Sequence, residues 1–181
     1  FYLARAYRPV WTEPARAEAL LAAVEALRGH GLDPADFSPA RVREAVLPGA
    51  ALGAVLGADP DRAAERELLL TDTLAALLFQ LRHGKVDPHT LYREWNFTPP
   101  PNPYERAGEL ARVLQAPDLA AAVEAQAPDL ALYRALRAEL LAQQGLLAGG
   151  DWPKVAAGPT LKPGARSARV AALRARLAAA G

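Results

Sequence analysis

The sequence predicts an all-α protein, an irregular multi-helix bundle with a short C-terminal helix. Along most of its 181 residues, apolar side chains recur at intervals of three and four positions, the period of a helix with one buried face. A capping side chain followed by proline, a common start of a helix, occurs several times. The alternation that marks a strand is missing, apart from an ambiguous stretch from Phe1 to Tyr7.

The first expected helix covers about residues 14–28, because Leu20, Val24 and Leu27 share one face there. Gly29 or Gly31 is expected to end it. Further helices are expected to begin where the side chain before a proline can accept a hydrogen bond from a free backbone N–H. Three such pairs are Asp33-Pro34, Ser38-Pro39 and Asp87-Pro88.

The strongest helical signal covers about residues 61–83. Asp59 is the expected N-cap, Pro60 takes the first helical position, and Gly84 follows the last turn. Five leucines of this segment fall on one face: Leu70, Leu74, Leu77, Leu78 and Leu81. They predict a helix that buries this face in the core.

Two more helices are expected in the C-terminal part of the chain. One covers about residues 129–144 and is expected to end at Gly145, and the other runs from about Val170 to Gly181. The alanine-rich stretch 119–131 also favours a helix. The proline-rich segment 98–104 predicts an extended spacer.

Composition excludes several classes of protein. Hydrophobic residues make up 51% and charged residues 23%, which is typical of a globular chain rather than a disordered one. No apolar run reaches the roughly 18 residues of a transmembrane helix. The chain has no cysteine, so thiol nucleophiles, disulfides and thiolate metal sites are all excluded.

Charge is distributed unevenly along the chain. Residues 1–151 carry 15 basic and 20 acidic side chains, whereas residues 152–181 carry six basic and no acidic ones. This change coincides with the segment Gly149-Gly150-Asp151-Trp152-Pro153, whose glycines and proline interrupt regular structure, and it indicates a candidate domain boundary.

Motifs of catalysis and of cofactor or metal binding are missing. The histidines His30, His83 and His89 lack metal-site spacing, and Ser38 and Ser167 lack a nucleophile-elbow context and look like helix N-caps. No glycine-rich phosphate loop is present. The sequence therefore predicts no catalytic, cofactor-binding or metal-binding residues.

The basic C-terminal segment is a candidate nucleic-acid surface, but we favour another interpretation. Its four arginines, Arg166, Arg169, Arg174 and Arg176, could neutralise phosphates, but no aromatic stacking residue accompanies them. Its apolar stripe, in contrast, is typical of an amphipathic helix that packs against a partner. We expect no nucleic-acid partner.

Several motifs follow one another in order along the chain. They are Phe1-Tyr2 with Arg5, Tyr7, Pro9 and Trp11; His30-Gly31-Leu32-Asp33-Pro34 with Phe37; Leu70-Thr71-Asp72 with Leu81; Gly84-Lys85-Val86-Asp87-Pro88 with Trp95; and Gly149-Gly150-Asp151-Trp152-Pro153 with Gly158-Pro159. This order resembles the YcbB-type murein L,D-transpeptidases of bacterial cell envelopes. Asp151 departs from the family's more usual Gly-Gly-Trp-Pro.

The resemblance implies a specific domain organisation. It implies a helical scaffold domain over residues 1–160 and the truncated start of an inserted peptidoglycan-binding-like module over residues 161–181. The family's catalytic domain, which makes peptidoglycan 3-3 cross-links, uses a cysteine in a Ser-His-Gly-Cys context, and this sequence has neither. The resemblance thus implies a non-catalytic scaffold whose partner is a catalytic domain in cis that is absent here.

The same resemblance implies a periplasmic or cell-envelope location, although the sequence shows no signal peptide. Four aromatic residues, Trp11, Phe37, Trp95 and Trp152, are candidate anchors, either in the core of the domain or where a catalytic domain docks. An exposed apolar patch is expected where that partner is missing. The alternative is a free-standing helical module that binds peptidoglycan or another protein.

Overall fold

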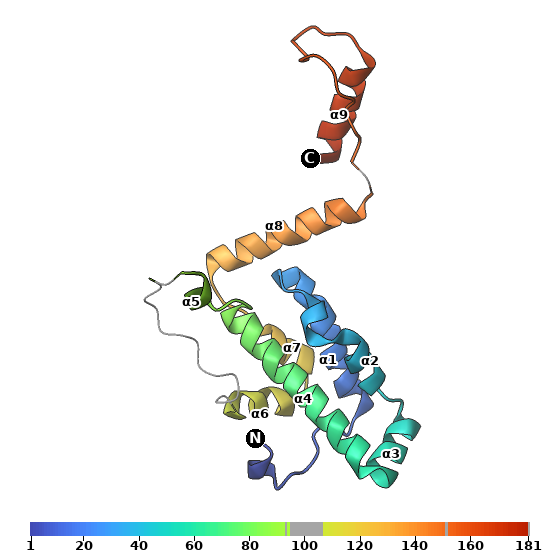
Figure 1. Cartoon of the computed structure of the whole chain (residues 1–181), viewed down its shortest axis with the longest axis vertical. Helices are drawn as coiled ribbons and strands as arrows, with labels where there is room; N and C mark the ends of the chain where they lie inside the picture. The colour runs from blue at the N-terminus through green and yellow to red at the C-terminus, as the bar shows by residue number, and fades with distance from the viewer. Residues whose placement is uncertain (93, 95–106, 151, 181) are drawn as a thin grey trace. The chain divides into compact units, whose positions relative to one another are not determined.

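The computed structural model describes residues 1–92, 94, 107–150 and 152–180, and all regular structure in these ranges is helical, as predicted (Figure 1). The elements in chain order are η1 (Leu3–Arg5), α1 (Pro14–Ala26), η2 (Leu27–His30), η3 (Pro34–Phe37), α2 (Pro39–Ala45), α3 (Gly49–Ala58), α4 (Pro60–His83), α5 (Pro88–Leu91), α6 (Ala107–Gln115), α7 (Leu119–Glu124), α8 (Ala131–Ala148) and α9 (Ala168–Ala180). The proline-rich segment 98–104 predicted to be a spacer lies outside the described residues.

The chain divides into two compact units, Phe1–Tyr133 and Arg134–Gly181, and the division falls within α8. The boundary that the sequence predicts after residue 160 is a boundary between family domains rather than between packing units, and it stays a prediction.

Helix α4 is the central element of the first unit. The Asp59 side chain accepts a hydrogen bond from the Arg62 backbone N–H at 3.1 Å, and Gly84 follows the helix with a φ of +84°, as the cap signals predicted. The predicted face is buried: Leu70, Leu74, Leu77, Leu78 and Leu81 are at most 7% exposed. Each such leucine stabilises the fold by about 1.5–3 kcal/mol relative to exposure.

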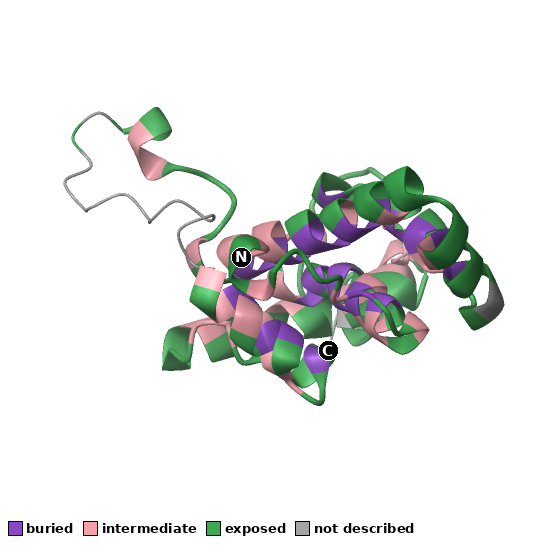
Figure 2. Ribbon diagram, turned by 90° about the horizontal axis from the view of Figure 1, so that it is seen from below, coloured by how far each residue is buried: buried purple, intermediate pink, exposed green. Residues whose placement is uncertain are grey.

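Helices α1, α2, α6 and α7 supply most of the rest of this core. Helix α1 contacts α2, α4 and α7, while α6 contacts α4 and α7. Buried and exposed residues alternate along the helical ribbons (Figure 2). Their buried apolar residues include Leu20, Val24, Val42, Val113 and Val123. One continuous core therefore joins segments that are more than 100 residues apart in sequence.

A helix begins at each of the three predicted pairs of a capping residue and a proline, but the predicted cap at Ser38 is wrong. The side chains of Asp33 and Asp87 accept from the backbone N–H two residues later, at 3.0 and 2.9 Å. Ser38 makes no such bond. It also ends η3, so its backbone takes a left-handed conformation with a φ of +47°. The serine is thus a connector between two helices.

Other boundaries differ from those predicted. The ambiguous stretch at Phe1 to Tyr7 contains a 3-10 helix rather than a strand. Helix α1 tightens into η2 and ends at Gly31, one of the two glycines predicted to end it, where φ is +75°. Gly145 does not end α8, which continues to Ala148 because the apolar spacing resumes at Leu146 and Leu147. Gly181 lies outside the described residues.

The second unit contains most of α8, then an irregular segment and α9. The Arg169 side chain donates from Nε to the Ala156 carbonyl oxygen at 2.8 Å and from Nη1 to that of Pro159 at 2.7 Å. The Arg176 guanidinium lies 4.2 Å from the centre of the Trp152 ring. Arginines of this helix therefore fasten it to the segment that precedes it.

Candidate functional site

The predicted aromatic anchors lie in different surroundings. Trp11 and Phe37 are buried in the core of the first unit, with exposures of 0% and 5%. Trp152 is half-buried in the second unit, beside Arg176. Trp95 lies outside the described residues. Trp11 and Phe37 therefore share a core, and Trp152 belongs to another unit.

Trp11 is held by polar side chains of α4 as well as by apolar packing. Its indole Nε1–H donates to Thr71 Oγ1 at 2.8 Å, and its backbone N–H donates to Glu67 Oε2 at 3.2 Å. Its carbonyl oxygen accepts from Arg66 Nη1 at 2.7 Å. Each polar group of this buried residue thus has a partner, which avoids the cost of an unpaired buried group.

Tyr2 completes this network from the N-terminal side. Its hydroxyl donates to Glu67 Oε1 at 2.9 Å and lies 2.6 Å from Thr71 Oγ1. The Val10 backbone N–H also donates to Glu67 Oε1, at 2.7 Å. Since the Tyr2 proton goes to the carboxylate, the Thr71 hydroxyl donates to the Tyr2 oxygen and accepts from the indole. We refer to Tyr2, Trp11, Arg66, Glu67 and Thr71 as the N-terminal clamp.

Burial determines the electrostatics of the N-terminal clamp. Desolvation raises the pKa of the Tyr2 phenol well above its usual range. The hydrogen bond from Thr71 lowers this pKa in part, and the negative charge of Glu67 raises it further. Desolvation lowers the pKa of the Arg66 guanidinium, while Glu67 raises it in part. Both oxygens of Glu67 already accept hydrogen bonds. The carboxylate therefore fastens the N-terminal segment and is not placed as a general base.

Sequence reasoning did not single out Arg66, Glu67 or Thr71 as site residues, although a signal was present. The buried face of α4 continues towards the N-terminus at intervals of three and four residues from Leu70 and Leu74, and it reaches charged residues there. Charged side chains on the buried face of a helix indicate polar partners from elsewhere in the fold.

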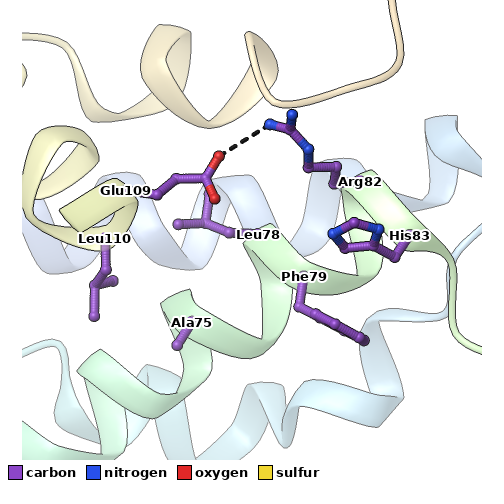
Figure 3. A pocket seen from close by; sticks show the side chains of 7 residues that line it. All are labelled: Ala75, Leu78, Phe79, Arg82, His83, Glu109 and Leu110. Atoms are coloured by element: carbon purple, nitrogen blue, oxygen red, sulfur yellow. Dashed lines mark hydrogen bonds and ion pairs between the residues drawn. The ribbon is translucent and has the colours of Figure 1, made fainter. Parts of the chain in front are cut away.

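The junction of α4 and α6 carries a polar cluster that closes a small hollow. Arg82 Nη1 lies 3.0 Å from Glu109 Oε1, and the rings of Phe79 and His83 lie beside this pair with centroids 5.0 Å apart (Figure 3). The hollow has a volume of about 20 Å³. Because that is room for about one water molecule, this cluster joins two helices and leaves no space for a substrate.

His30 links η2 to two later elements of the first unit. Its Nδ1 lies 2.7 Å from the Tyr133 hydroxyl and its Nε2 lies 3.1 Å from Glu124 Oε2. The side chain of His30 is only 3% exposed. Two partners on two different helices thus fix the orientation of the imidazole, which is a structural arrangement.

A hollow on the first unit forms a groove along α4. It has a volume of about 840 Å³, with Leu68, Leu69 and Ala75 on α4, Phe1 on the N-terminal side and Leu110 on α6. Leu68 is 58% exposed, although it lies in the middle of the central helix. We refer to this hollow as the α4 groove.

Neither thiol chemistry nor a metal cluster finds its residues in the described part of the chain. The sequence has no cysteine, and among the described residues no group of three or more His, Asp or Glu side chains is placed to hold a metal ion. None of the described helices has both the length and the apolar character that crossing a membrane requires.

Comparison with known proteins identifies the family. No curated protein and no solved structure matches the chain. Residues 1–140 match the family model described as Scaffold domain. These residues include the N-terminal clamp, the core and the α4 groove, and on this match the chain belongs to the scaffold domain family.

Proposed function

We propose that this chain is the non-catalytic scaffold portion of a cell-wall L,D-transpeptidase of the bacterial cell envelope. It packs against a cysteine-dependent catalytic domain that makes peptidoglycan 3-3 cross-links, and it positions that domain. Support comes from the scaffold domain match, the ordered motifs that resemble the YcbB-type family, and the absence of a thiol nucleophile.

The observation that carries the docking role is the exposure of Leu68 in the α4 groove. Leu68 lies on the central helix, and a partner that covered its exposed surface would gain up to about 1.5–3 kcal/mol. The groove is large enough to receive several side chains of a partner. Its neighbours include charged residues such as Arg41 and Glu65, which give the apolar floor a polar rim.

The test measures binding of the chain to a separately purified L,D-transpeptidase catalytic domain by titration calorimetry. Leu68→Asp places a charge in the α4 groove, and we expect it to weaken binding at least tenfold. Val86→Asp is the matched control, because Val86 is also an exposed apolar residue, at 55%, but lies outside the groove. No binding by the unaltered chain, or equal losses in the two variants, contradicts the proposal.

The alternative, a free-standing peptidoglycan-binding module, requires aromatic rings on the surface. Trp11 and Phe37 are buried, whereas Tyr7 and Tyr92 are the exposed aromatic side chains among the described residues, at 72% and 64%, and could stack on a sugar. Cosedimentation with purified sacculi separates the two functions. Binding that is lost in a Tyr7→Ala/Tyr92→Ala variant favours the alternative, and no binding favours the scaffold.

A further inference from the structure

The segment 152–181 carries a positive charge that none of its own side chains neutralises. It contains six basic side chains and no acidic one, whereas residues 1–151 carry 15 basic and 20 acidic side chains. Four of the six cations are exposed and lie outside the contacts that hold α9: Lys154, Lys162, Arg166 and Arg174. No ion pair involves any of these four among the residues that the structure describes. We refer to them as the exposed cations.

The other two cations of the segment hold it together. Arg169 donates to the carbonyl oxygens of Ala156 and Pro159, and Arg176 lies over the Trp152 ring. These contacts fasten α9 to the irregular segment before it. The exposed cations therefore belong to one packed body and not to a loose tail, which lowers the entropic cost of presenting them together to a partner.

Helix α9 combines this charge with an exposed apolar side chain. Leu177 is 61% exposed, and Arg174, three positions earlier, is exposed as well. Residues three apart lie on the same side of a helix, one turn from each other. Val170 and Leu173, the other members of the apolar stripe, are half-buried. An exposed leucine beside a guanidinium is typical of helices that lie at a lipid–water interface.

Nucleic acid matches the same charges less well than a lipid surface does. Proteins that bind single strands stack the bases on aromatic rings. Trp152 is the one aromatic residue in the sequence of this segment, it is half-buried, and Arg176 lies over its ring. Little of the ring is therefore left for a base. An anionic lipid surface needs no aromatic ring, because it attracts basic side chains through its charge density.

We propose that the segment 152–181 binds the surface of a membrane that contains anionic lipids. The exposed cations contact the phosphate headgroups, and Leu177 enters the boundary between headgroups and acyl chains. Residues 1–151 have a net negative charge, so the same lipids attract this segment and not the rest of the chain. The α4 groove takes no part in this contact, and the test is independent of the scaffold function.

The first experiment measures cosedimentation of the full chain with lipid vesicles. One set of vesicles is phosphatidylcholine alone, and the other is an equal mixture of phosphatidylcholine and phosphatidylglycerol. We expect binding to the mixed vesicles only, and an at least tenfold lower partition coefficient when sodium chloride rises from about 0.05 M to about 0.5 M, because salt screens exposed charges. Equal binding to the two sets, or binding to neither, overturns the proposal.

Variants then assign the binding to the exposed cations. We expect Lys162→Gln/Arg174→Gln to weaken binding to the mixed vesicles at least tenfold, because each basic side chain near an anionic surface contributes roughly fivefold. Arg8→Gln/Arg112→Gln is the matched control, since it removes the same charge from two exposed arginines of the first unit. All four side chains are exposed, so both variants should fold. Equal weakening in the two variants overturns the proposal.

A last comparison separates a lipid surface from other polyanions. Leu177→Ser leaves every charge in place, and we expect it to weaken binding to the mixed vesicles at least threefold, because the leucine leaves water when it enters the lipid. Ala178→Ser is the matched control at the neighbouring exposed position. A mixed-sequence single-stranded oligonucleotide is titrated at the same ionic strength, and we expect weaker binding than to the vesicles. Tighter binding of the oligonucleotide, or equal effects of the two serine variants, overturns the proposal.

Discussion

Glu67→Gln tests whether the N-terminal clamp holds the fold together. The carboxylate accepts from the backbone N–H of Val10 and the hydroxyl of Tyr2 through one oxygen, and from the backbone N–H of Trp11 through the other. Glutamine has one acceptor oxygen, so its amide N–H₂ must face a backbone N–H in place of an acceptor. It also removes the negative charge that raises the pKa of the buried Arg66 guanidinium.

The expected loss of stability follows from these contacts. Hydrogen bonds to charged groups contribute about 1.5–3 kcal/mol, and a buried unpaired N–H costs about 1–3 kcal/mol, so we expect a loss of about 2–4 kcal/mol. Urea unfolding followed by circular dichroism measures it. The matched control is Glu18→Gln, because Glu18 is an exposed glutamate on α1. A loss below about 0.5 kcal/mol, the usual range for a surface substitution, refutes the structural role of Glu67.

Three further outcomes are expected. The folded-state pKa of Tyr2 is raised above its unfolded value of about 10, so the stability contributed by its neutral phenol is complete below about pH 10 and is lost as the pH rises towards the folded-state pKa. Urea unfolding midpoints measured between about pH 8 and 11 check this dependence. The Tyr2→Phe variant must lack the decrease in stability that Tyr2 causes. Leu74→Ala leaves a cavity in the core, and we expect it to lower the free energy of unfolding in urea by about 2–5 kcal/mol. Leu68→Ala, at a site that is 58% exposed, is expected to change it by no more than about 0.5 kcal/mol. Similar losses in the two variants contradict the burial pattern of α4. Asp59→Ala removes the α4 cap and is expected to cost about 1 kcal/mol in the same assay, and Asp59→Asn, which retains an acceptor, is expected to recover most of it.

The sequence predicted the helices whose caps and apolar spacing lie within the helix itself or directly beside it. Helix α4 has a capping aspartate, a proline at its first position, a repeated leucine spacing and a glycine at its end, and all of them agree. Helix α3 was not predicted, because its ten residues are apolar or glycine and show neither a polar face nor a capping side chain. Gly145 gave a false end to α8, since a glycine inside a helix costs only about 1 kcal/mol and flanking leucines continue the spacing.

The N-terminal clamp could not be predicted in the same way, because its partners are far apart in the chain. Tyr2 and Thr71 are separated by 69 positions, and Trp11 and Glu67 by 56. Spacing along α4 places a glutamate and a threonine on its buried face, but it does not say which donors reach them. The aromatic residues were identified from sequence, whereas the polar network that orients Trp11 required the fold.

The N-terminal clamp and the α4 groove share residues, and this links stability to the proposed docking surface. Tyr2 and Thr71 belong to the clamp and also line the groove. The hydrogen bonds to Glu67 hold the N-terminal segment against α4, and that segment forms one wall beside Leu68. A rigid wall allows a partner to bind without ordering a loose segment, which lowers the entropic cost of docking. The buried polar groups of α4 thus shape the proposed docking surface.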